Sequence, residues 1–474
     1  MSESQVAAVL SRHWKMAVLA AAGFATVAAT TTFVAVNHRE AVAGARSSTA
    51  HADGKGLPAG GGGDSGGKGK EGHGKEGGGA HDKGGKKHDD KYGGHHGDDA
   101  TYVKCDPNDL IANLVDLNAD SGGELVLAKD CTYTLTVNQD GNGLPVIVQP
   151  ITIHGNGATI QRAADIDQFR FFQVAAGGEL KLSHLSLTRG ETAEDQDGGA
   201  IQVDAAGRLT LDRVNLEDNT VDSITGDDGG AINNEGITDI RRSTFRGNSA
   251  QEGGAILNDG GKLRVEGSKL TRNLANAGGG AIGNRAGTVL ITKSLISANH
   301  ANDGGGLNAS GLLELEDSAV IDNTAVNAGG IISFGALYVR HSTVSGNIAT
   351  DGPGGIFASA AGVIEDSKVN DNANAGTSGT GGGVRADGEL SIRRSEVVGN
   401  QAPGNGAVGG GVYVNSGATL RLTDSKVKRN ISDEPAGGVH NLGTVITYGK
   451  VRIIDNVPTN CQATGTNPVP NCFG

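Results

Sequence analysis

Residues 253–273 read GGAILNDGGKLRVEGSKLTRN, and stretches of the same pattern recur about every twenty-five residues. Each copy opens with a glycine pair, continues with two apolar residues spaced by one, and closes with Ser-x-apolar-x-x-Asn. The first glycines of the pairs are Gly198, Gly229, Gly253, Gly279, Gly304, Gly329, Gly354, Gly381, Gly409 and Gly437. Repetition at this period predicts a solenoid, in which every repeat stacks on its neighbours.

The closing asparagine fixes the register of the repeats. The ten asparagines are Asn219, Asn248, Asn273, Asn299, Asn323, Asn347, Asn372, Asn400, Asn430 and Asn456. Three residues before each stands an apolar residue, such as Phe245 or Leu270, in a chain that is only 36% hydrophobic. This position should therefore face a dry interior in every repeat.

The spacing of apolar residues within a repeat favours strands over helices. Leu263 and Val265, like Leu420 and Leu422, recur at spacing two, and glycine punctuates the turns. Three short strands per repeat would make one coil of a parallel β-helix, with coils stacked at about 4.8 Å. We interpret the asparagines as a structural ladder, since asparagine tolerates left-handed backbone and stacked amides can hydrogen-bond from coil to coil.

The chain before the repeats divides into two segments. Residues 1–45 contain an uncharged run, Met16–Val36, and we expect either a cleaved export signal or an N-terminal membrane anchor. Residues 46–100 are rich in Gly, His, Lys and Asp, which predicts a disordered linker. Its histidines and carboxylates, as in His88-Asp89-Asp90, leave transition-metal binding open as an alternative to a solvated tether.

Residues 101–474 form the predicted folded domain. Asp106 and Pro107 predict the start of a short helix, which would cover the open end of the first coil. The four cysteines lie at the two ends of the domain. We predict the disulfides Cys105–Cys131 and Cys461–Cys472, because any other pairing would join opposite ends of a rod about 50 Å long.

The opening of the domain and its repeats carry a family resemblance. Residues 105–136, Gly143-Leu144-Pro145-Val146-Ile147 and residues 151–160 are similar to the opening of exported bacterial right-handed β-helix proteins. The Gly-Gly-Ala-Ile and Phe245-Arg246-Gly247-Asn248 repeats resemble those of polymorphic outer membrane proteins. The resemblance implies an all-β fold, a single-stranded right-handed parallel β-helix of the pectate-lyase-like kind with a short N-terminal capping helix. Such motifs specify fold much more than activity.

Acidic residues gather before the first glycine pairs. Asp195 and Asp197, Asp227 and Asp228, and Glu252 would be brought together by stacking, as a calcium or carbohydrate site or as a solvated acidic rim. A calcium-dependent polysaccharide lyase would use such a rim together with a basic residue. The sequence motifs of galacturonase-like hydrolases are absent from the coils, so no residue is assigned a catalytic role.

Charge excludes one class of partner. The formal net charge is −13, and charged residues preceding the repeated serine alternate in sign along the stack, as at Asp212 and Arg241. Nucleic acid needs a basic stripe of one sign. We therefore expect a secreted or cell-surface scaffold or adhesion protein, without cofactor unless calcium binds, that contacts an envelope glycan or a surface protein. We expect contact with a membrane only through the N-terminal segment. The alternative to the scaffold is a calcium-dependent carbohydrate-active enzyme that uses the acidic rim.

Overall fold

The computed structural model describes residues 100–193, 196–221, 228–377, 379–462 and 468–473. The predicted signal or anchor, residues 1–45, and all but the last residue of the predicted linker, 46–100, lie outside this range. Among the described residues no helix is both long enough and apolar enough to cross a membrane.

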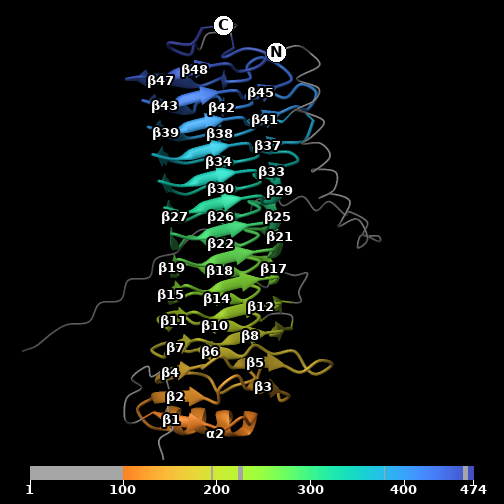
Figure 1. The fold of residues 1–474 in the computed structure, drawn as a ribbon, viewed down its shortest axis with the longest axis vertical. Coiled ribbons are helices and arrows are strands. Elements are labelled where there is room, and N and C mark those ends of the chain that lie inside the picture. The colour runs from red at the N-terminus through yellow and green to blue at the C-terminus, as the bar shows by residue number, and fades with distance from the viewer. Residues whose placement is uncertain (1–99, 194–195, 222–227, 378, 463–467, 474) are drawn as a thin grey trace, which may run out of the picture. The chain divides into compact units, whose positions relative to one another are not determined.

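The described domain is a right-handed parallel β-helix, as predicted (Figure 1). The strands form four parallel sheets, which have 14, 13, 11 and 10 strands, and each coil from Gly198 onward, except the last, adds one strand to every sheet. One coil consists of β18 (Ile256–Asp259), β19 (Lys262–Glu266), β20 (Lys269–Thr271) and β21 (Leu274–Gly278). The expectation of three strands per coil was wrong, because the segment after each asparagine also pairs with its neighbours and forms the 10-stranded sheet.

The 11-stranded sheet carries the candidate site. In sequence order its strands are β6 (Phe172–Val174), β10 (Ile201–Val203), β14 (Ile232–Asn234), β18, β22 (Ile282–Arg285), β26 (Leu307–Ala309), β30 (Ile331–Ser333), β34 (Ile356–Ala358), β38 (Val384–Ala386), β42 (Val412–Val414) and β46 (Val439–Asn441). Nine of the strands have three residues, so only the middle side chain points outward, while β18 and β22 have four, so Asp259 and Arg285 point outward as well.

The core is a continuous apolar column inside the coils. Alternation along β19 turns Leu263 and Val265 inward, where they are at most 2% exposed. All ten apolar residues three positions before the asparagines are also buried, at 0 to 3% exposure. Each such side chain stabilises the fold by about 1.5–3 kcal/mol relative to solvent exposure, so the repeat pattern itself supplies the driving force.

The asparagines form an uninterrupted ladder. Each side-chain amide donates to the side-chain oxygen of the next asparagine, at 2.9 to 3.0 Å from Asn219 through to Asn456. The left-handed residue of this turn is the one before the asparagine, for example Arg272 with φ 57° and Asp322 with φ 55°. Asparagine is therefore needed for its amide, while the preceding residue adopts the left-handed backbone.

A second ladder was not predicted. The backbone N–H of Ser243 donates to the hydroxyl of Ser268 at 3.0 Å, and the same bond links every serine up to Ser425. The residue before each serine is again left-handed, as at Lys293 with φ 50°. Two one-residue turns per coil, each closed by a buried polar side chain, thus hold neighbouring coils in register.

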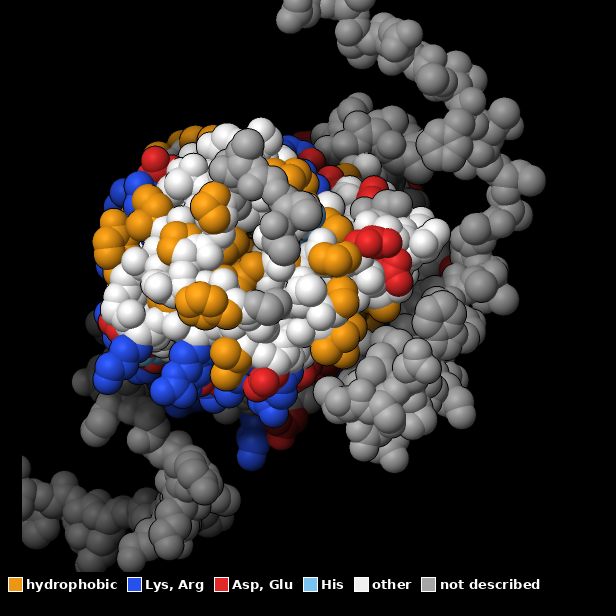
Figure 2. All heavy atoms as spheres, turned by 90° about the horizontal axis from the view of Figure 1, so that it is seen from above, with side chains coloured by type: hydrophobic (Ala, Val, Ile, Leu, Met, Phe, Trp, Pro, Cys, Tyr) orange, Lys and Arg blue, Asp and Glu red, His pale blue; other side chains and the backbone are white. Residues whose placement is uncertain are grey.

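The N-terminal end of the stack is covered by a helix, as the sequence predicts. The helix α2 (Pro107–Ala119) begins after its N-cap Asp106, and Leu110 and Leu114 are fully buried against the first coil. Disulfides join Cys105 to Cys131 and Cys461 to Cys472. Figure 2 views the end that carries the last coils, where hydrophobic side chains are exposed among polar ones. Large apolar residues exposed in the last coils and tail are Leu442, Tyr448, Ile454 and Phe473.

Candidate functional site

The outward side chains of the 11-stranded sheet form one column, which we call the groove floor. The in-register pairing of the strands stacks Gln173, Gln202, Asn233, Leu257, Gly283, Asn308, Ile332, Phe357, Arg385, Tyr413 and His440. Several of them are buried although they point out of the coil, among them Asn233 at 1% and His440 at 7% exposure. The floor therefore lies between flanking residues, and its character changes from polar to aromatic along the stack.

The polar end contains the acidic residues that the sequence singled out. Asp197, Asp228 and Glu252 each precede a glycine pair and are linked through the backbone. Oδ1 of Asp197 accepts from the N–H of Asp228, and Oδ1 of Asp228 accepts from the N–H of Glu252, both at 2.8 Å. Asp195 and Asp227 lie outside the described residues. Stacking thus does bring together the three predicted acids that the structure describes.

The local backbone explains why these acids sit so close to the coil. Gly253 follows Glu252 with φ 61°, in the left-handed region that glycine adopts without strain. At Gly254 a β-carbon would lie 2.3 Å from the carbonyl oxygen of Gly280 in the next coil. The glycine pair therefore draws neighbouring coils together directly beside the acidic residues.

Arg285 occupies the centre of this cluster and was missed by sequence analysis. Its guanidinium contacts Oδ2 of Asp228 at 2.7 Å and Oε2 of Glu252 at 2.9 Å, with Asp259 further away at 3.9 Å. Aligning the repeats by their glycine pairs would place Arg285 directly after Asp259 in one column. That alignment is the signal that could have found it.

Burial and charge shift the protonation of the cluster. Burial raises the pKa of Asp228 to about 6, even though Arg285 favours the ionised form, and the neighbouring Glu252 adds to the increase. Burial by itself lowers the pKa of Arg285, but the hydrogen bond to Glu252 and the charge of Asp228 outweigh it and raise the pKa. At neutral pH the cluster is therefore an ion-paired network whose cation is firmly protonated.

The predicted calcium site gains no support from the described residues, among which no three His, Cys, Asp or Glu side chains are placed to hold a metal ion. Two floor oxygens beside the acids, Oε1 of Gln202 and Oδ1 of Asn233, are buried and accept no hydrogen bond from the described residues. Because Asp195 and Asp227 lie outside the description, calcium binding stays a prediction.

The aromatic end of the floor has a different chemistry. The guanidinium of Arg385 lies 5.4 Å from the ring centre of Phe357 and 5.6 Å from that of Tyr413. Tyr413 in turn stacks on His440, with ring centres 5.3 Å apart and planes 4° from parallel. Burial lowers the pKa of His440, which keeps the imidazole neutral at pH 7. Aromatic residues make up only 3% of the chain, so this grouping in one column marks a specialised surface.

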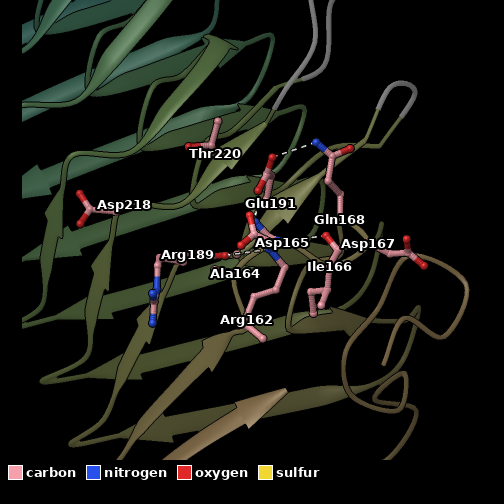
Figure 3. Close-up of a pocket in the computed structure, with 12 residues that line it drawn as sticks. Arg162, Ala164, Asp165, Ile166, Asp167, Gln168, Arg189, Glu191, Asp218 and Thr220 are labelled. Atoms are coloured by element: carbon pink, nitrogen blue, oxygen red, sulfur yellow. Dashed lines mark hydrogen bonds and ion pairs between the residues drawn. The ribbon is translucent and has the colours of Figure 1, made fainter. Parts of the chain in front are cut away.

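A second hollow lies beside β5 (Thr159–Arg162), around the segment 163–168 that follows it (Figure 3). Its volume is about 730 Å³. Arg162 forms an ion pair with Glu191, whose other oxygen accepts from Gln168 at 2.8 Å. Arg162 also donates to the carbonyl oxygens of Arg189 and Ile166 at 3.1 Å. The ion pair and these hydrogen bonds therefore hold the segment 163–168 in place beside β5.

Comparison with known proteins agrees with the architecture. Residues 229–383 match a family model described as the right handed beta helix region. The fold and this match define a protein built around a right-handed β-helix. Searches of curated proteins and of solved structures gave no significant match.

Proposed function

We propose that the protein is an exported, non-catalytic β-helical scaffold that binds a ligand along the groove floor. The observation that carries this proposal is the ion-paired state of the acidic cluster, in which Arg285 contacts both Asp228 and Glu252. The acids that the sequence offers for chemistry are thus engaged with a fixed cation. The remainder of the groove presents stacked rings and amides, which suit binding.

The chemistry of the cluster argues against a lyase. A lyase base must lose its proton near neutral pH, and catalytic bases have pKa values tuned toward that range. The pKa of Arg285 is instead raised by Glu252 and Asp228. A calcium ion at the same place would also be repelled by the guanidinium that already pairs with both carboxylates.

The hollow beside β5 supports the same reading. Among the carboxylates that line this hollow, Glu191 forms an ion pair with Arg162. Its other oxygen accepts a hydrogen bond from Gln168. A general acid or base needs a carboxylate that exchanges a proton with the substrate. Glu191 is instead part of the loop's support.

Export is proposed from the residues at both ends of the domain. The predicted signal or anchor at 1–45 would deliver the domain out of the cytoplasm. The disulfides Cys105–Cys131 and Cys461–Cys472 fit an oxidising compartment. We place the protein at the cell surface or in the medium, with an envelope glycan or a surface protein as its partner.

Affinity electrophoresis combined with a cleavage assay tests the function. The full chain should be retarded in gels that contain an envelope polysaccharide, without producing new reducing ends or unsaturated ends. If the wild type cleaves the polysaccharide and Asp228→Asn and Arg285→Gln do not, the scaffold proposal is wrong and the protein is a lyase. A fusion of residues 1–45 to a reporter that is active only outside the cytoplasm tests export separately, and an inactive fusion would contradict it.

A further inference from the structure

The aromatic part of the groove contains a cavity of about 280 Å³. Its apolar lining includes Ile332, Phe334, Pro353 and Phe357, which belong to two successive coils. Phe334 is 48% exposed, and its ring meets that of Phe357 edge-on at 63°, with centres 5.9 Å apart. About half of Phe334 is therefore open to a ligand, while the guanidinium of Arg385 lies over the ring of Phe357.

Polar groups at the rim of the cavity are held in fixed positions. Asp387 binds Arg385 with both oxygens, at 2.8 and 3.0 Å, and Thr380 accepts from the same guanidinium at 3.0 Å. Asn327 donates to Oδ1 of Asp303 at 2.9 Å, which orients this carboxylate. The cavity thus combines an apolar platform with a preorganised donor and a preorganised acceptor.

We propose that this cavity binds a pyranose ring of a neutral saccharide. A pyranose has an apolar face of C–H groups and an edge of hydroxyl groups, so it matches an aromatic platform flanked by hydrogen-bonding side chains. The inference rests on the proposed binding function and names the ligand class of the same groove.

Charge decides between neutral and acidic sugars. The charge of Arg385 is already balanced by Asp387, and Asp303 adds a further negative charge to the rim. A uronate would therefore meet net repulsion, while a hydroxyl group can donate to Asp303 and accept from Arg385. Beyond the cavity, Tyr413 and His440 are only 8% and 7% exposed, so the proposed sugar site is confined to the cavity.

Saturation-transfer difference NMR on the full chain tests this inference directly. The neutral probes are the methyl pyranosides of glucose, galactose, mannose and N-acetylglucosamine. The charged comparison is the methyl glycoside of galacturonic acid, with its carboxylate free. We expect saturation of ring C–H protons in at least one neutral probe and a weaker signal for the uronate. Phe334→Ala should weaken binding about three- to tenfold, the effect of losing one aromatic contact.

Tyr448→Ala is the matched control, because Tyr448 is also exposed, at 54%, and is not among the residues that line the cavity. Phe334→Leu keeps apolar volume without the ring and provides a second variant if Phe334→Ala unfolds. Absence of saturation transfer to all four neutral probes overturns the inference, as does equal binding by wild type and both Phe334 variants. The saturation-transfer results do not depend on the cleavage assay. A failure of the proposed sugar site can therefore be told apart from a failure of the proposed non-catalytic scaffold.

Discussion

The side-chain amide of Asn323 donates to Oδ1 of Asn347 at 2.9 Å, and both residues are fully buried. Oδ1 of Asn323 in turn accepts two hydrogen bonds from Asn299, one from its backbone and one from its side chain. One side chain therefore bonds to the coils on both sides of its own, which explains its repetition through the stack.

Asn323→Ala should lower the free energy of unfolding by about 3 kcal/mol, because it leaves two donors of Asn299 buried without an acceptor. Urea unfolding followed by circular dichroism measures the change. Asn215→Ala, on the exposed surface of a coil, is the control and should change stability by less than about 0.5 kcal/mol. Equal losses in the two variants would mean that the ladder does not stabilise the coils.

Arg285→Gln should destabilise the protein at pH 7.5 by about 2 kcal/mol, since Asp228 loses its counter-charge in a buried position. This expected loss of stability is smaller than that for breaking a fully buried ion pair, because the Arg285 side chain is 41% exposed and solvent screens its charge. Arg264→Gln, which breaks an exposed pair with Glu266, is the control. Thermal unfolding at pH 7.5 and pH 5 should show a smaller loss at the lower pH, where Asp228 is protonated.

Calcium should distinguish the wild type from Arg285→Gln. We expect the melting temperature of the wild type to be the same in calcium and in chelator, because Arg285 already pairs with both Asp228 and Glu252. In Arg285→Gln the positive charge beside Asp228 and Glu252 is lost, so calcium can bind these carboxylates and should raise the melting temperature. Calorimetric calcium binding by the wild type that Asp228→Asn abolishes would instead establish the calcium site predicted from the sequence.

Asp228 should make stability fall as the pH rises. Its pKa is about 6 in the folded state against an ordinary value of 3.8, so the folded state holds the proton more tightly. This stabilisation is complete below about pH 3.8 and is lost as the pH rises through 6, a change on the order of 3 kcal/mol. The difference in unfolding free energy between wild type and Asp228→Asn, measured from pH 4 to 7, isolates this group. A difference independent of pH would refute the assignment.

Opening the Cys105–Cys131 disulfide should lower stability by about 3 kcal/mol, since the bridge closes a segment with a sequence separation of 26. The double variant Cys105→Ser, Cys131→Ser is compared with wild type by thermal unfolding without reductant. The shorter Cys461–Cys472 segment, with a separation of 11, should contribute less. A larger loss from the C-terminal pair would contradict this order.

Local rules made most of the fold predictable. The repeat period, the buried residue before each asparagine and the capping signal at Asp106 and Pro107 all concern residues near one another in sequence. The fourth strand was missed because short segments such as β21 become strands only by pairing with neighbouring coils. The serine ladder was missed because its bonds run from a backbone N–H to a hydroxyl and not between two like side chains.

The candidate site was less predictable. The acids Asp197, Asp228 and Glu252 could be placed together because each holds the same position in its repeat. Arg285 comes from a different position and reaches the cluster across the sheet. The aromatic floor likewise depends on register, because Phe357, Arg385 and Tyr413 are far apart in sequence and become neighbours only when strands pair.

The sequence by itself determined that the chain forms stacked coils, which residues face the core and where the capping helix begins, because periodic burial, turn chemistry and helix capping act between residues close in sequence. Only the tertiary structure decided which outward side chains share a surface. Parallel pairing places residues about twenty-five positions apart at the spacing of adjacent strands, roughly 4.8 Å. The stacking also pairs Arg285 with Asp228 two coils away and sets Arg385 between two rings, which makes one end of the column an ion-paired network and the other an aromatic cluster.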